Sequence, residues 1–285
     1  MLQTDLDLLR KVFGDKKSGR MQACCLRSRA WLSWLLWRTG LEADAFAARY
    51  VYNGRTKSNL VARWINGSVA PTEHSVHRIN KALPGCLQLY DLPIFKLLED
   101  RPMSASEVLN LIEPYNNPDH LKEAFGNGIC SKDAQFSKME RSRSISFWMW
   151  DSQSLVERGD LWGFQMIVGM VRLAEARGEQ TGHLQCAKDM FRALPSALKE
   201  PWLRPHLDLL FRCLEDIRRR VVYTGLIFDV DLDVIRRAAM DRGLQPRPMS
   251  YERNCQKRRA RYLEDPILEG HVVSGRMANQ GLNGS

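Results

Sequence analysis

Residues 28–85 carry the clearest pattern of short helices in the chain and read SRAWLSWLLWRTGLEADAFAARYVYNGRTKSNLVARWINGSVAPTEHSVHRINKALPG. The apolar residues of this stretch recur at helical spacing, and turn-forming residues interrupt them at short intervals. Helix breaks are expected at Gly40, at Asn53-Gly54 and at Asn66-Gly67, and Pro71-Thr72 is suited to open a further helix. The stretch therefore predicts four short helices joined by tight turns.

The four helices are expected over about 30–38, 41–50, 58–65 and 72–83. In the second helix, Phe46 and Ala47 should face inward, and the small Ala47 lets a neighbouring helix approach closely. In the third helix, Leu60, Val61 and Trp64 are the expected core residues. Several short helices in so few residues are typical of compact DNA-binding units.

Four motifs stand in a fixed order within this stretch. They are Phe46-Ala47, the run VARWING at Val61–Gly67, Pro71 four residues later, and the run SVHRINKAL at Ser75–Leu83. This order resembles the lambda-repressor-like (Cro-like) helix-turn-helix family over residues 20–85, and the C-terminal half resembles no family that we recognise. The resemblance implies that the third helix lies in the major groove of DNA, with its first residues at base edges.

The same resemblance implies which side chains contact DNA. The base-reading candidates are Lys57, Ser58, Asn59 and Arg63. Asparagine pairs bidentately with adenine, and arginine or lysine pairs with guanine. The phosphate-contacting candidates are Arg49, Arg55, Asn66 and Ser68. The alternative interpretation of Arg49 and Arg63 is that they are solvated surface charges.

One feature departs from the family pattern. The stretch Val51–Lys57 is longer than the usual tight turn between the second and third helices. Because of this longer turn, the residue at which the third helix begins is defined only to within one or two positions. The longer turn also allows a second interpretation, in which the fold is a scaffold within a protein-interaction subunit of a larger complex.

Positive charge is concentrated in two segments of the chain, whose formal net charge is +9. Residues 20–85 hold 10 Lys and Arg against 3 Asp and Glu, and residues 242–261 hold 7 against 1. Residues 86–241 hold 20 against 23 and are slightly acidic. This distribution suits a polyanionic partner such as double-stranded DNA, although a solvated basic tail would give the same numbers.

Helices are also expected over about 104–112, 151–177, 181–194 and 201–222. Ser104 and Glu107 form a capping-box pattern, and Pro195 is expected to stop the third of these helices. The last helix carries one apolar stripe, made by Leu203, Leu207, Leu210, Leu214, Ile217 and Val221. The stripe favours an intramolecular core helix, and the alternative is the seam of a homodimer.

The chain is thus predicted to be all-α, with an N-terminal helix-turn-helix domain followed by a C-terminal helical domain. The predicted divisions are a helix or arm over 1–19, the helix-turn-helix domain over 20–85, a helical connector and mobile linker over 86–144, the C-terminal domain over 145–265, and a disordered tail over 266–285. The C-terminal domain would serve dimerisation, effector sensing or partner binding.

Other chemistry receives less support from the sequence. Asp229, Asp231 and Asp233 alternate as ligands for Mg²⁺ on a strand would, which leaves a metal-dependent nucleic-acid enzyme as an alternative. A helix cap with neighbouring acids is the favoured explanation. His74 and His77 lie one turn apart without an evident third ligand, so no metal or other cofactor is expected.

The seven cysteines include no C-x-x-C pair, which argues against a zinc site or a disulfide framework and favours a reducing cytoplasm. No apolar run approaches the ~20 residues of a membrane span. The sequence therefore predicts a cytoplasmic, non-enzymatic, sequence-specific DNA-binding protein, such as a transcriptional regulator of bacterial or mobile-element origin.

Overall fold

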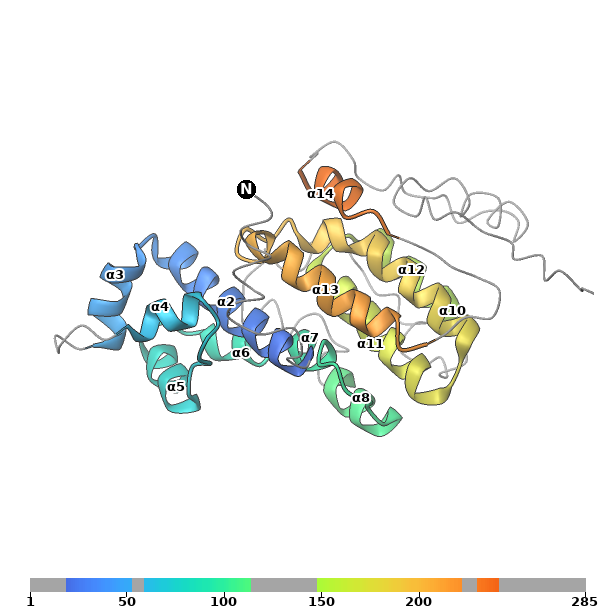
Figure 1. The fold of residues 1–285 in the computed structure, drawn as a ribbon, viewed down its shortest axis with the longest axis horizontal. Coiled ribbons are helices and arrows are strands. Elements are labelled where there is room, and N and C mark those ends of the chain that lie inside the picture. The colour runs from blue at the N-terminus through green and yellow to red at the C-terminus, as the bar shows by residue number, and fades with distance from the viewer. Residues whose placement is uncertain (1–18, 53–58, 114–147, 222–229, 241–285) are drawn as a thin grey trace, which may run out of the picture.

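The computed structural model describes residues 19–52, 59–113, 148–221 and 230–240. Every regular element in these ranges is helical (Figure 1), which confirms the predicted all-α class. The predictions for the arm before residue 19, the linker within 114–147, the basic segment at 242–261 and the tail from 266 lie outside the described residues.

The N-terminal part of the chain contains eight described elements. They are α2 (Gly19–Thr39), α3 (Ala43–Phe46), the π-helical segment η1 (Ala47–Val51), α4 (Leu60–Ile65), α5 (Glu73–Ala82), α6 (Cys86–Tyr90), α7 (Pro93–Leu97) and α8 (Ala105–Ile112). The C-terminal part contains α10 (Trp148–Arg158), α11 (Leu161–Arg177), α12 (Gln180–Ala197), the 3-10 turn η6 (Arg204–His206), α13 (Leu207–Arg218) and α14 (Leu232–Met240).

Local signals place several helix ends where the sequence predicts them. Gly40 follows the last residue of α2 with a φ of +65°, a conformation that suits glycine. The Thr72 side chain accepts a hydrogen bond from the Ser75 backbone N–H at the start of α5, and Ser104 accepts one from Glu107 at the start of α8. These predicted boundaries are confirmed. They could be predicted because each depends only on residues close to it in the sequence.

The single helix predicted over 151–177 is wrong, because the chain forms α10 and α11 with a break between them. Gly159 adopts a φ of +66°, and the Asp160 carboxylate accepts a hydrogen bond from the Gly163 backbone N–H at 2.8 Å. A Cβ atom on Gly163 would lie 2.6 Å from the Leu155 carbonyl oxygen. The break therefore folds α11 back closely against α10.

The stop predicted at Pro195 is also wrong, because α12 continues to Ala197. Proline removes one backbone hydrogen bond, but Leu194, Ser196 and Ala197 are buried and hold the last turn in the core. The helix predicted over 201–222 is shorter than expected. It begins at Leu207, after the 3-10 turn that contains Pro205, and ends at Arg218.

The apolar stripe of this last helix lies inside the chain's own core. Leu203, Leu207, Leu210, Leu214 and Ile217 are buried, and Val221 is half-buried. Helix α13 packs against α2, so the intramolecular interpretation holds for the described residues. The stripe is therefore covered by other residues of the same chain.

Helix α2 joins the two parts of the molecule. It begins at Gly19, well before the helix predicted over about 30–38, and it contacts α13 and η6 as well as α4 and α6. The buried hydrophobic residues form one cluster that extends from Ala23 to Ile235. Figure 1 shows α3, α4 and α5 at one end of the molecule and α10–α13 at the other, with α2 between them.

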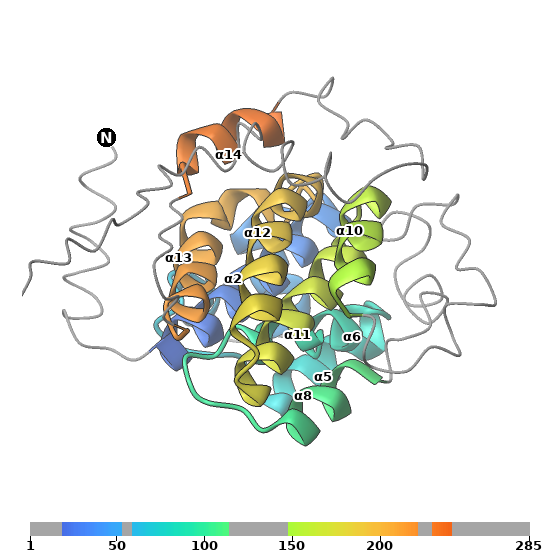
Figure 2. The same ribbon diagram turned by 90° about the vertical axis from the view of Figure 1, so that its right-hand side faces the viewer.

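The C-terminal helices form a bundle around α11, whose residues from Leu161 to Ala174 are all buried. Figure 2 shows α12 over α11, with α10 and α13 on either side. Helices α7 and α8 pack against α11 as well, so the described part of the predicted connector belongs to the core. Among the described residues, none of the helices combines the length and apolar character needed to cross a bilayer.

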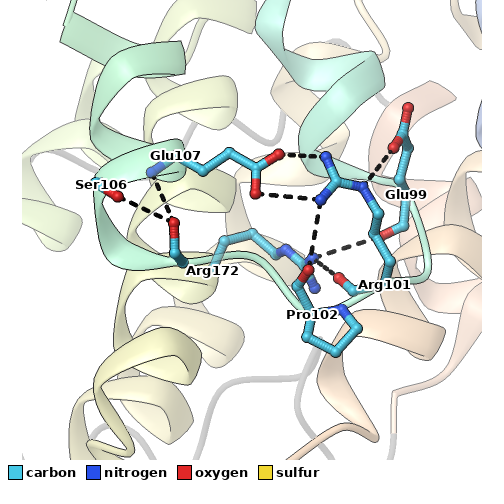
Figure 3. A network of polar contacts seen from close by, with 7 residues as sticks. Glu99, Arg101, Pro102, Ser106, Glu107 and Arg172 are labelled. Carbon is cyan, nitrogen blue, oxygen red and sulfur yellow. Dashed lines mark hydrogen bonds and ion pairs between the residues drawn. The ribbon is translucent and has the colours of Figure 1, made fainter.

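A buried arginine ties the turn between α7 and α8 to this bundle. The side chain of Arg172, on α11, is fully buried and donates to the Glu175 carboxylate at 2.6 Å. It also donates to the backbone carbonyls of Glu99 and Arg101 (Figure 3). Arg101 in turn pairs with the carboxylates of Glu99 and Glu107. The network fixes the entry to α8 against α11.

Candidate nucleic-acid interface

Helix α4 has an inward and an outward side. Val61 and Trp64 are buried, at 3% and 1% exposure. The exposed residues at helical spacing are Asn59, Ala62, Arg63 and Asn66. A helix of six residues is not stable alone, so tertiary contacts must set its position.

An aromatic cluster anchors the inward side of α4. The ring of Trp64 meets that of Trp31, on α2, edge-on at 5.8 Å, and Trp31 meets Tyr90 in the same way at 5.5 Å. The Trp31 indole N–H donates to the Cys86 carbonyl at 2.9 Å, and the Tyr90 hydroxyl donates to the Pro71 carbonyl at 3.1 Å. Helices α2, α4 and α6 therefore share one buried contact.

The turn that leaves α4 lies directly against α2. Gly67 has a φ of +66°, and a Cβ atom there would lie 2.0 Å from the Cys25 sulfur. Arg29 donates from Nη2 to the carbonyl oxygen of Asn66 at 2.8 Å. The break predicted at Asn66-Gly67 is confirmed, and the close approach to α2 explains why glycine is required there.

The helix that precedes α4 in sequence consists of α3 and η1, which run on without a gap. Phe46 and Ala47 are buried, as predicted. The Tyr52 backbone N–H donates to the Ala47 carbonyl, five residues earlier, which is the π-helical pattern. Arg78, on α5, donates to the Val51 carbonyl at 3.0 Å and fixes the end of this segment.

The structure describes one of the base-reading candidates at the start of α4 and one within it. Asn59 is exposed at the position before the helix, and its side chain makes no cap hydrogen bond. Arg63 is exposed one turn further on. Lys57 and Ser58 lie outside the described residues, so the sequence prediction for them stands alone.

The phosphate-contacting candidates are spread over two elements. Arg49 is exposed on η1, where its guanidinium lies 5.4 Å from the centre of the Tyr50 ring. Asn66 and Ser68 are exposed at the exit of α4, and the Ser68 hydroxyl donates to the Arg63 carbonyl at 3.2 Å. Arg55 lies outside the described residues.

The sequence interpretation missed Arg29, which is part of the same region. It lies on α2, and 37 residues separate it from Asn66. No local pattern links the two positions. The only sequence signal was the general excess of basic residues over 20–85.

The carboxylates considered for metal binding serve a helix start instead. The Asp231 carboxylate accepts from the backbone N–H groups of Asp233 and Val234 at the start of α14, and Asp233 pairs with Arg236 at 2.7 Å. They therefore do not line a strand, and Asp229 lies outside the described residues. Across those residues, no three His, Cys, Asp or Glu side chains are grouped to hold a metal ion. His74 and His77 are exposed on α5.

Glu200 and His206, which are half-buried, have displaced pKa values. Burial raises the pKa of Glu200 to about 7, although the hydrogen bond from the Trp202 indole N–H opposes this shift. Burial also lowers the pKa of His206 to about 4, and the positive charge of Arg29 acts in the same direction. His206 Nε2 and the Ser33 hydroxyl, on α2, are joined by a hydrogen bond of 2.9 Å. His206 thus connects α2 to the C-terminal part.

Comparisons of the chain with protein-family models, with curated protein sequences and with solved structures find no match in any of the three.

Proposed function

We propose that this chain binds double-stranded DNA in a sequence-specific manner, with α4 as the helix that enters the major groove. The observation that carries the proposal is the two-sided character of α4. Its inner side is fixed by Trp64 in an aromatic cluster, while Asn59 and Arg63 face outward. These are residue types that pair with adenine and guanine.

Charge and arrangement give further support. Residues 20–85 hold a net charge of +7, as the difference between 10 basic and 3 acidic residues. Helices α3, α4 and α5 lie at one end of the molecule (Figure 1), away from the C-terminal helices, where residues 148–240 hold 13 basic and 13 acidic residues. A polyanion approaching that end would meet the basic segment first.

In this proposal the roles follow the helix-turn-helix pattern. Asn59 and Arg63 contact bases, together with Lys57 and Ser58, while Arg49, Arg55, Asn66 and Ser68 contact phosphates. Transcriptional control in the cytoplasm of a bacterial cell, or in the service of a mobile element, belongs to the same proposal. The C-terminal bundle would then offer a surface for an effector, a partner protein or a second copy of the chain.

The test begins with selection of bound duplexes from a random-sequence library by the full chain. Binding to the selected duplex and to a scrambled one is then measured by fluorescence anisotropy at several salt concentrations. Arg63→Ala should reduce the preference for the selected duplex by about 1–3 kcal/mol. Arg219→Ala, which removes an equal charge from the exposed end of α13, should leave the preference unchanged.

The competing function is that of a protein-interaction subunit, in which the helix-turn-helix fold is only a scaffold and the C-terminal helical half docks onto a larger complex. It predicts no enriched sequence and no salt-dependent binding to any duplex at low salt. That result would overturn the proposal.

A further inference from the structure

The two ends of α4 are held differently. At its first end, Asn59 makes no side-chain cap bond. At its last end, four backbone N–H groups are bonded within the turn, from Asn66, Gly67, Ser68 and Val69. Trp64 anchors the inward side of α4, and the orientation of so short a helix depends further on what its C-terminal end contacts.

That end rests on Arg29. Its guanidinium donates to the carbonyl of Asn66, the residue that closes α4. The last carbonyls of a helix carry partial negative charge and have no partner within the helix, so a cation bonded there is favourable. Hydrogen bonds from a charged donor are also stronger than neutral ones.

The part of α2 that carries Arg29 is itself held in place. One turn further along α2, the Ser33 hydroxyl is bonded to His206 of the C-terminal part at 2.9 Å. On the neighbouring turn, Cys25 lies so close to Gly67 that no side chain fits between them. The arginine therefore extends from a helix that is held on two sides.

We infer that Arg29 is a positioning residue, which sets the orientation of α4 and thereby the alignment of Asn59 and Arg63 with base edges. The effect on DNA binding rests on the proposed function, whereas the effect of Arg29 on the orientation of α4 does not. Arg29 links the C-terminal bundle, through α2, to the helix proposed to read DNA.

Arg38 offers a matched control on the same helix. It donates from Nη1 to the Pro84 carbonyl at 2.9 Å, an equivalent bond that supports the chain between α5 and α6 instead of α4. Arg29→Met and Arg38→Met remove the same charge and the same type of bond. A difference between the two variants therefore reflects where the lost hydrogen bond lies, and not the loss of one positive charge.

Amide hydrogen exchange of the full chain, without DNA, tests the structural part. Arg29→Met should accelerate exchange at residues 66–69 by about tenfold, the loss expected for one charge-assisted bond, and leave residues 83–87 unchanged. Arg38→Met should do the reverse. Equal exchange at 66–69 in the two variants would overturn the inference, whether or not the chain binds DNA.

The DNA part is tested with the duplex selected by the wild-type chain. Arg29→Met should lower the ratio of specific to scrambled-duplex affinity by about tenfold, whereas Arg38→Met should lower both affinities together and keep the ratio. Arg29→Lys, which retains a cation, should restore part of the ratio. A ratio unchanged in Arg29→Met would overturn the positioning role, while absence of DNA binding by the wild type would overturn only the proposed function.

Discussion

Gly67 couples a backbone conformation to a close contact between helices. Gly67→Ala must hold an alanine at φ +66° and place its Cβ atom against the Cys25 sulfur. We expect a loss of about 2–4 kcal/mol in the free energy of unfolding, which urea denaturation measures.

Gly40→Ala separates the two causes. Gly40 has nearly the same φ, +65°, but nothing lies within 4 Å of an added Cβ atom. It should cost only about 1 kcal/mol, the penalty for the left-handed conformation. Equal losses in the two variants would show that the contact with Cys25 contributes nothing.

Glu200 makes stability depend on pH. Because burial raises its pKa to about 7 in the folded state, the folded chain favours the protonated carboxyl group. Its contribution to stability is fully present below the unfolded pKa, near 4.5, and is lost as the pH rises through about 7. Glu200→Gln removes this dependence and keeps an acceptor for the Trp202 indole.

We therefore expect Glu200→Gln to be the more stable form at pH 8 by roughly 3 kcal/mol at most, with the difference shrinking toward pH 5. Urea midpoints of both forms at the two pH values measure it. A difference that stays constant with pH would contradict the displaced pKa.

At the scale of elements, Arg172 holds the turn between α7 and α8 against α11. Arg172→Met leaves the Arg101 carbonyl without its side-chain donor and removes one of the two donors to the Glu99 carbonyl, which keeps the Arg101 backbone N–H. We expect it to cost about 2–4 kcal/mol in the free energy of unfolding. Arg236→Met, which breaks the more exposed pairs with Asp208 and Asp233, should cost less than about 1 kcal/mol. Similar costs would show that the buried network is not required.

The sequence predicts elements well where their ends depend on neighbouring residues. Thr72, Ser104 and Gly40 mark boundaries because a cap or a left-handed turn is decided within three or four residues. The break at Gly159 was missed because isolated glycine is tolerated in a helical pattern. Pro195 was misread because burial of the last turn of α12, a tertiary effect, outweighs one lost hydrogen bond.

The candidate site also combines features that the sequence predicts with contacts that only the structure shows. The inward side of α4 follows from periodicity, whereas the outward placing of Asn59 and Arg63 is what the family resemblance implies. The bond from Arg29 to Asn66 and the bond between Ser33 and His206 join residues 37 and 173 positions apart. No pattern in one sequence links such positions, so only the folded structure brings them together.

At the scale of the whole molecule, α2 belongs to the core of both parts. Because one hydrophobic cluster extends through them, we expect one cooperative unfolding transition. Differential scanning calorimetry measures it, with a calorimetric enthalpy equal to the van't Hoff enthalpy. Two resolved transitions would instead show that the parts unfold independently and that α2 does not couple them.

The proposed role of α4 in reading DNA is tested by the preference of the full chain for one duplex sequence. We expect that selection enriches a defined sequence, that the affinity for it falls steeply with salt, and that Arg63→Ala loses the preference while Arg219→Ala keeps it. Failure to enrich any sequence, together with no binding to duplex DNA at low salt, would show that α4 does not read DNA.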